Sequence, residues 1–444
     1  MSKCRLLFII LSLAIYSSGI PAPGLLYAQV TTNWTGGGAP GDWNDAANWS
    51  SGVPGGGDNA IIDFSANDPV LASAATTNDL TVNSGAVMTV NGQQLTVNGD
   101  LTVILSDTPG DGLIMTNPAD EVIVAGNAHF TTVSQHGSAS SIGNYAGGVL
   151  RIQGNFTQTR VGASAGPNSF VSTGTKVVLD GTSPQTMSFF EAGVASSRLG
   201  DIDLENTAGV TFGTSVFIDG QLSLTDGVTL SQASNLSTYF ASRLPIIAPS
   251  ATYSVFNTRT SGSVVMTGAV NMAESISSLF VEQSNTLTLA GHSLEIGGGL
   301  TVIISNTVGD GLIIADPSDI LTVNGDALFT TESQHGSASS VGNFTDGTFR
   351  FRGNFTQTRN GASAGVASFA STGTRAIFDG ATPQTIFSAE AGLGASHFAD
   401  VDIDNAAGVS FISSAAASGT VRVIDGIASS TTGTVTIDGD LVDV

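Results

Sequence analysis

The chain has 444 residues, of which 36 are acidic and 13 basic, for a net charge of −23 with neutral histidines. Its 55 glycines and 13 prolines accompany 41% hydrophobic residues, a composition that fits neither collagen, a disordered tail nor a coiled coil. So acidic a surface repels phosphate backbones and anionic lipids. We therefore expect no binding to nucleic acid or to a membrane surface.

The first 28 residues have the layout of a secretory signal peptide. Lys3 and Arg5 precede the apolar run 6–16, and Ala28 offers a cleavage site. The run is too short to span a membrane, so we expect no transmembrane segment in the mature chain. Cleavage removes the only cysteine, Cys4, and leaves 11 basic against 36 acidic residues, a net charge of −25. We predict an extracellular or cell-surface protein, associated with the outer membrane.

Short strands make up the mature sequence. In residues 95–103 apolar side chains occupy alternate positions, as in a strand with one buried face. Thr-Val pairs end at Val82, Val90, Val97 and Val103, so three strand-and-turn steps take 21 residues. That is the scale of one triangular coil, and we predict an all-β chain folded as a parallel β-helix, a rod of roughly 90 Å. Asn-Gly and Asp-Gly pairs favour hairpins, so an array of β-sandwich domains is the alternative.

The sequence also contains a duplicated segment that is much longer than one coil. Residues 95–212 align without a gap onto 294–411 at a constant offset of 199, and 131–166 match 330–365 at 26 of 36 positions. So long a gapless alignment indicates duplicated structure. The linking coils are expected to be interrupted near residues 243–247. The strand-like C-terminal residues indicate a missing partner, a truncated reading frame or self-association at that end.

The predicted organisation is a signal peptide (1–28), a cap rich in Trp and Gly (29–64), a first solenoid block (65–212), linking coils (213–290), a second block (291–411) and terminal coils, truncated or not (412–444).

All three tryptophans, Trp34, Trp43 and Trp49, fall among Gly and Asn near the start of the mature chain. Exposed indoles beside Asn and Asp can stack on sugar rings, which makes these residues candidates for carbohydrate binding. A cap that buries the indoles over the first coil is the alternative, because a solenoid end needs covering. Exposure of at least two rings would favour the binding site.

Two acidic segments at equivalent positions of the duplication are candidate calcium sites. Alternation places three carboxylates of each segment on one outward strand face, with neighbours roughly 7 Å apart. Carboxylate oxygens suit calcium, and the separation is also in the range of glycosidase carboxylate pairs. A solvated acidic face is the simpler interpretation. The residues are Asp201, Asp203 and Glu205 in the first copy and Asp400, Asp402 and Asp404 in the second.

The duplicated segment Ser-Gln-His-Gly-Ser-Ala-Ser-Ser contains His136 and His335. Neither histidine has another His or a Cys nearby in sequence, so zinc binding and Ser-His-Asp catalysis lack support. We expect a small polar loop that projects from the coil, preserved either as a repeated ligand contact or by recent duplication. In the nearby Gly-Asn-Phe-Thr-Gln-Thr-Arg repeat, Phe should point inward and Gln form stacked amide hydrogen bonds. Arg160 and Arg359, which end the repeat, should pair with carboxylates.

The tryptophan segment, the Leu-Thr-Val rungs and the units Val-Leu-Asp-Gly-Thr-Ser-Pro-Gln-Thr-Met (178–187) and Ile-Phe-Asp-Gly-Ala-Thr-Pro-Gln-Thr-Ile (377–386) resemble large repetitive surface proteins secreted by Gram-negative bacteria. These include autotransporter-like passengers and cargo of sorting-domain secretion systems. The resemblance covers most of 31–411 and implies a right-handed β-helix displayed outside the cell, often with an adhesive role.

We therefore predict a secreted, non-enzymatic β-solenoid that acts as a surface or matrix protein or adhesin, with carbohydrate or a neighbouring surface protein as partner. The alternatives are an extracellular β-helix protein that binds polysaccharide, a polysaccharide lyase or hydrolase on the same fold, and a calcium-stiffened filament. Fold alone does not separate them.

Overall fold

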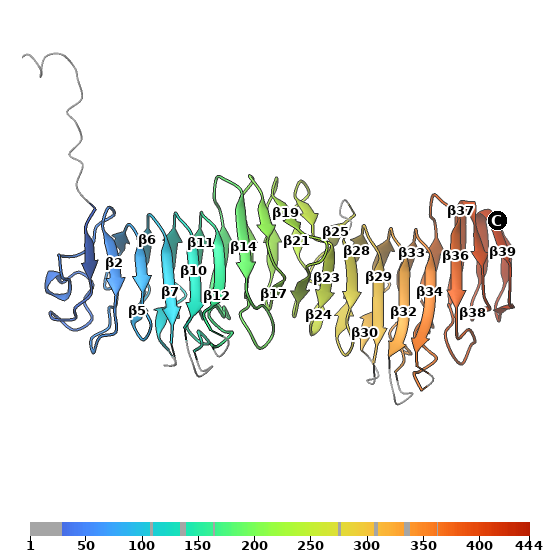
Figure 1. Ribbon diagram of the computed structural model, residues 1–444. Coiled ribbons are helices and arrows are strands. Elements are labelled where there is room, and N and C mark those ends of the chain that lie inside the picture. The colour runs from blue at the N-terminus through green and yellow to red at the C-terminus, as the bar shows by residue number, and fades with distance from the viewer. Residues whose placement is uncertain are drawn as a thin grey trace, which may run out of the picture.

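The computed structural model describes residues 29–106, 110–133, 139–162, 165–273, 277–305, 310–332, 338–361 and 363–444. The chain forms an elongated stack of about 15 coils, with strands side by side along the rod (Figure 1). The strands of the sheets pair in parallel, so the predicted β-solenoid is confirmed and a β-sandwich array, which needs antiparallel sheets, is excluded. One 3₁₀ turn, η1 (Ala46–Asn48), lies near the start.

The first half of the rod has two long sheets. Sheet 1 contains β1 (Thr31–Asn33), β2 (Asn59–Ile62), β4 (Leu80–Val82), β7 (Leu101–Leu105), β10 (Ala128–Thr132), β12 (Phe156–Arg160), β14 (Gln185–Phe189), β16 (Val210–Phe212), β19 (Thr229–Gln232) and β22 (Thr252–Ser254). Sheet 2 contains β3 (Ala75–Thr77), β6 (Gln94–Val97), β9 (Glu121–Val124), β11 (Val149–Ile152), β13 (Lys176–Leu179), β15 (Ile202–Leu204), β18 (Leu222–Leu224) and β21 (Ile246–Ile247).

The second half is dominated by sheet 3, which has two columns joined at its C-terminal end. The first column contains β17 (Val216–Ile218), β20 (Thr238–Phe240), β23 (Asn257–Thr260), β26 (Ser278–Val281), β29 (Leu300–Ile304), β32 (Ala327–Glu332), β34 (Phe355–Asn360), β36 (Gln384–Ser388) and β37 (Asp400–Phe411). The second contains β25 (Val270–Met272), β28 (Ser293–Ile296), β31 (Ile320–Val323), β33 (Thr348–Phe351) and β35 (Arg375–Phe378), and pairs with β37.

Short strands complete the coils. They are β5 (Val87–Thr89) with β8 (Gly112–Ile114), β24 (Ser263–Val265) with β27 (Thr286–Thr288) and β30 (Gly311–Ile313), and β38 (Ala415–Ala417) with β40 (Val435–Ile437). The ten-residue strand β39 (Val421–Ser430) pairs with β37 and extends sheet 3 to β41 (Leu441–Asp443). Most side chains of 424–444 are exposed.

Coil length varies more than the sequence pattern predicts. The coil from Leu80 to its register partner Leu101 takes the expected 21 residues, but the coil from Phe156 to Met187 takes 31. The extra residues lie in the corner loops that follow sheet 1. Because the coils are longer than predicted, the chain forms fewer coils. At about 4.8 Å per coil the rod is roughly 70 Å long, which is shorter than the predicted length.

The Asn-Gly pairs sit at coil corners and not in hairpins. Asn91 and Gly92 have φ values of 58° and 78°, and they turn the chain from β5 toward β6 within one coil. The left-handed turn that this dipeptide favours is therefore present, but it joins strands of two different sheets.

The sheets are interrupted where the sequence predicts an interruption. Sheet 2 ends at β21 and sheet 1 at β22, whereas the column that starts at β17 continues through β23 into the second copy. As a result β26, the duplicate of β4, stacks on a different column from the one that contains β4. We call residues 241–273 the seam.

A continuous apolar core runs inside the rod. Phe130, Phe156 and Phe170 pack in the first copy with ring centroids 4.6–5.5 Å apart. The second copy is richer in rings, because Phe349 and Phe351 stand where the first copy has leucine and isoleucine. Inward alternation thus holds in both copies, as period two requires.

Candidate functional site

The three tryptophans form a buried cluster at the first coil. Trp34, Trp43 and Trp49 are 3%, 1% and 4% exposed and belong to the continuous core. The Trp49 ring lies edge-on to both others, at 5.1 Å from Trp34 and 4.7 Å from Trp43, and its Nε1 donates to the Trp43 carbonyl at 2.7 Å. The prediction that these indoles bind sugar is wrong, because buried rings have no free face for a ligand.

His136 and His335 lie outside the described residues, but residues before and after each of them are described. The Thr132 hydroxyl donates to the Gly166 carbonyl at 2.5 Å, and the Thr331 hydroxyl donates to the Gly365 carbonyl at 2.5 Å. The same hydrogen bond is therefore present in both copies.

Further hydrogen bonds near these two threonines are also duplicated. The Asn144 amide donates to the Asp111 carbonyl at 2.7 Å, and its counterpart Asn343 donates to Asp310 at 2.8 Å. Backbone and hydroxyl groups around Ser141 repeat in the same way around Ser340. We call each set of these residues a platform: Thr132, Ser141 and Asn144 in the first copy, and Thr331, Ser340 and Asn343 in the second.

Gln158 and Gln357 stabilise the coil next to each platform. Each is buried, donates to a serine hydroxyl at 2.7 Å and accepts from the backbone N–H of a glutamate at 3.0–3.1 Å. The stacked amide bonds expected from the sequence are not formed by these side chains, because their amide nitrogens bond within their own coil.

The two arginines that end the repeat pair as expected. Arg160 lies 2.7 Å from Glu191, and Arg359 lies 2.7 Å from Glu390. Arg160 also lies over the exposed ring of Phe190, 5.5 Å from its centroid.

In the first copy the acidic segment is part of an ion-pair ladder. Asp203 lies 2.9 Å from Lys176, and this hydrogen bond raises the pKa of the ammonium. Glu205 lies 3.3 Å from Arg151, while Asp201 accepts the N–H of Gln221 at 2.8 Å. The three carboxylates share a face, but each has a separate donor.

In the second copy the middle carboxylate is completely covered. Asp402 is 0% exposed and accepts from both Arg375 and Arg422, the latter at 2.6 Å. The prediction of a solvated face is wrong at Asp402, because the two guanidinium groups shield it from water. Asp400 accepts the Thr420 N–H at 2.7 Å, and Asp404 is exposed.

No group of three or more His, Cys, Asp or Glu side chains that could hold a metal occurs in the residues that the structure describes. Calcium at the acidic segments therefore stays a prediction without a converging ligand set. At least one oxygen of each carboxylate except Asp404 already accepts from a cation or a backbone N–H group.

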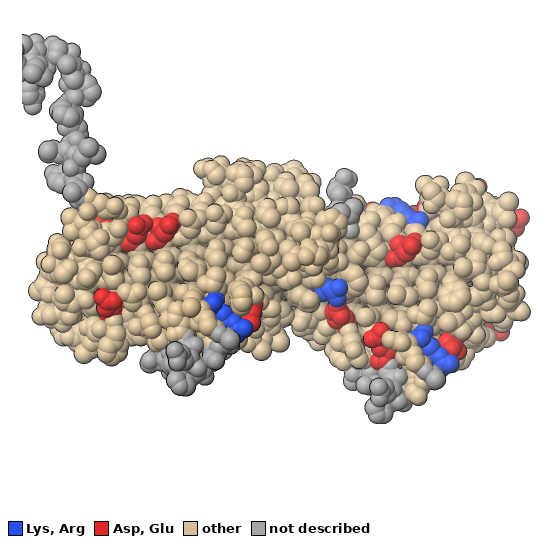
Figure 2. All heavy atoms as spheres, viewed as in Figure 1, with Lys and Arg blue, Asp and Glu red and all other residues tan. Residues whose placement is uncertain are grey.

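Within the described ranges, every basic side chain except Arg243 pairs with a carboxylate. The paired residues are Arg151, Arg160, Lys176, Arg198, Arg259, Arg350, Arg352, Arg359, Arg375 and Arg422. Figure 2 shows these charges in small groups, with a broad uncharged surface between them. The unpaired carboxylates thus set the sign of the surface potential.

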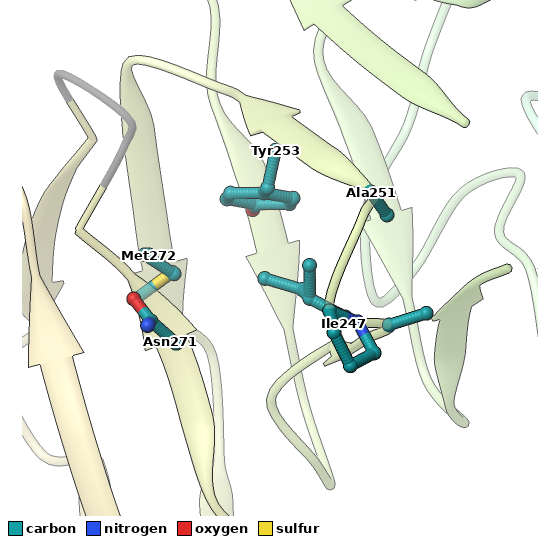
Figure 3. Close-up of a pocket in the computed structure, with 7 residues that line it drawn as sticks. Ile247, Ala251, Tyr253, Asn271 and Met272 are labelled. Atoms are coloured by element: carbon teal, nitrogen blue, oxygen red, sulfur yellow. The ribbon is translucent and has the colours of Figure 1, made fainter. Parts of the chain in front are cut away.

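The seam contains a small cavity and a groove. Side chains of 247–253 and of β25 meet there, as Figure 3 shows for Ile247, Tyr253 and Met272. The inner cavity holds about 90 Å³, and the groove beside it, which shares Ile247 and Asn271, holds about 400 Å³. Tyr253 is buried, and its hydroxyl forms a 2.9 Å hydrogen bond with Thr258 inside the core.

One buried carboxylate in each copy escaped the sequence analysis. Asp111 accepts from the N–H and hydroxyl of Ser106 at 2.7 and 3.0 Å, and its Oδ1 is buried without a partner. Burial raises the pKa of Asp111. Asp310 repeats this arrangement with Ser305. The duplicated Gly-Asp-Gly-Leu-Ile at 110–114 and 309–313 is the signal that could have identified both.

Comparison with known proteins gives no relative. No family model, no curated protein and no solved structure matches the chain. Among the described residues, no helix is both long and apolar enough to cross a membrane.

Proposed function

We propose that the chain is a secreted or cell-surface β-solenoid with a structural and adhesive role. The observation that carries this proposal is the pair of platforms, which repeat the same hydrogen bonds on one rod. About eight coils separate them, or roughly 40 Å along the axis. Two equivalent platforms at a rigid spacing suit multivalent attachment, in which two weak contacts act together.

The uses of the charged residues agree with this role. Arginines and acidic side chains on the outer faces tie neighbouring coils to each other, as Arg151 does by contacting Glu121, Asp180 and Glu205 on three different coils. Such ladders stiffen a surface that stays strongly acidic. High net charge keeps an exported rod soluble.

The test measures how strongly beads that carry the full chain attach to surfaces of the two expected partners, carbohydrate or cell-surface protein. Thr132→Val and Thr331→Val each remove the hydroxyl that donates to a glycine carbonyl in one platform. If the two platforms act together, either single variant weakens attachment moderately and the double variant weakens it by far more. Thr186→Val, at an exposed position of β14, is the control and should attach like the unaltered chain. Undiminished attachment by the double variant would contradict attachment through the platforms, and no attachment by the unaltered chain would contradict the adhesive role.

Export is tested separately. Antibody or protease should reach the protein on intact cells, and its N-terminal sequence should begin at Gln29. Retention of residues 1–28 in a cell-internal protein would contradict the secreted role. Release of new reducing ends from any polysaccharide by the purified chain would contradict the non-enzymatic assignment.

A further inference from the structure

The second copy carries a straight column of outward side chains along the rod. Successive strands β26, β29, β32, β34 and β36 place these residues opposite one another in register. The neighbours on either side in each strand are buried, whereas the column residues are partly exposed. The column consists of Phe280, Thr301, Leu328, Thr356 and Phe387.

The first copy has the same column with different chemistry. Strands β4, β7, β10, β12 and β14 stack in the corresponding register and place Thr81, Thr102, His129, Thr157 and Ser188 on the outside. Thr102 and Thr157 correspond to the two threonines of the second copy. The other three positions have a threonine, a histidine and a serine in place of Phe280, Leu328 and Phe387. Since these strands form with hydroxyl and imidazole groups outside, the sheet itself does not require the apolar residues of the second copy.

The spacing of the apolar residues matches an extended polymer. Coils follow one another at about 4.8 Å, so Phe280, Leu328 and Phe387 recur at roughly 10 Å intervals, with a threonine halfway between. One coil is close to the length of one pyranose residue in an extended (1→4)-linked chain, whose rings face the same way at every second residue. Alternate rings can pack on the apolar side chains while Thr301 and Thr356 hydrogen-bond to the sugars between them.

The charge around the column selects against an acidic polymer. None of its five residues is charged. Arg259 stands in register next to Phe280, 4.3 Å above its ring, and pairs with Glu282. On a rod of net charge −23 before cleavage, an anionic polysaccharide would meet repulsion along its whole length.

We infer that this outer face of the second copy binds an extended neutral polysaccharide that lies along the rod axis. Phe280, Leu328 and Phe387 support the sugar rings, and Thr301 and Thr356 bond to hydroxyl groups. The inference rests on the adhesive role proposed above and names a ligand class for it.

The test uses retention of the full chain on microcrystalline cellulose and chitin, and its mobility in gels that contain hydroxyethyl cellulose or polygalacturonate. The combined variant Phe280→Thr, Leu328→His and Phe387→Ser installs the residues of the first copy. We expect about tenfold weaker binding for each ring lost, so at least a hundredfold in total. Ile320→Thr, which makes a similar exchange at an exposed site outside the column, should leave retention unchanged.

The reciprocal exchange provides a gain of binding. Thr81→Phe, His129→Leu and Ser188→Phe should create a second column and increase retention, which no loss of folding could imitate. Circular dichroism melting establishes that each variant is folded.

Three results would overturn the inference: undiminished retention of the folded combined variant, a preference for polygalacturonate, or no retention on any of the neutral polymers. The bead assay separates these from failure of the adhesive role. If beads attach through the platforms but the chain does not bind neutral polysaccharides, the proposed ligand class is wrong and the adhesive role is not contradicted.

Discussion

Truncation of Trp49 should detach the N-terminal cap from the rest of the rod. The ring is 4% exposed, lies edge-on to Trp34 and Trp43, and donates a hydrogen bond from Nε1. Replacing a buried tryptophan by alanine costs about 4 kcal/mol, and the two ring contacts place Trp49→Ala toward the upper part of the range. At the end of a solenoid this cost falls on local opening, which becomes about a thousandfold more populated.

The chain offers two separate signals for this experiment. Its three tryptophans all lie in the cap, so their fluorescence reports on the cap alone, whereas far-ultraviolet circular dichroism reports on the whole rod. In urea, Trp49→Ala should lose the fluorescence of Trp34 and Trp43 well before the dichroism changes. Phe64→Ala removes a ring that is 77% exposed and should shift neither signal. Coincident, unshifted transitions in Trp49→Ala would refute the cap.

Four further predictions concern the body of the rod. Gly154→Ala would place a Cβ 2.4 Å from a carbonyl of the preceding coil and should destabilise the chain by about 1–3 kcal/mol, whereas Gly394→Ala meets nothing within 4 Å; urea titration of both measures the difference. Gln158→Ala removes the acceptor of the Glu191 N–H and the amide that donates to the buried Ser169 hydroxyl, and it should cost about 1–3 kcal/mol by the same assay. Burial raises the pKa of Asp111, so the native state holds its proton longer than the unfolded state; stability should fall as pH rises through that raised pKa, and Asp111→Asn should remove this part of a pH series of urea titrations. The melting temperature should be equal in calcium and in chelator, because carboxylates such as Asp402 are held by arginines, and a rise with calcium would contradict this.

The alternation of the sequence predicted the strands well wherever one coil is short. The Leu-Thr-Val units became β4, β6 and β7 with leucine and valine buried, since period two leaves only one way to bury them. The longer coils were not predicted, because polar corner loops such as 190–198 carry no periodic signal. The seam was located by its prolines and irregular spacing, but the shift of columns there depends on pairings between distant strands.

The candidate site was predicted less well than the fold. Local sequence showed that Asp402 lies on the outside of its strand, but not that Arg375 and Arg422 of adjacent coils cover it. Likewise the tryptophans have Gly and Asn as sequence neighbours and core residues as spatial ones. In a solenoid the residues that decide exposure are one coil away, which is 20 to 31 positions along the chain.

In the proposed adhesive role, one continuous rod holds the two equivalent platforms at a fixed spacing. Ile142 and Val341 are equivalent residues beside the platforms and are 58% and 55% exposed. Spin labels on Ile142→Cys and Val341→Cys, with Cys4→Ser to remove the only native thiol, allow the separation to be measured by double electron–electron resonance. We expect one narrow distance population of roughly 40 Å, from about eight coils of 4.8 Å. A broad distribution that extends well beyond this distance would show that the two copies move independently, and would contradict this expectation.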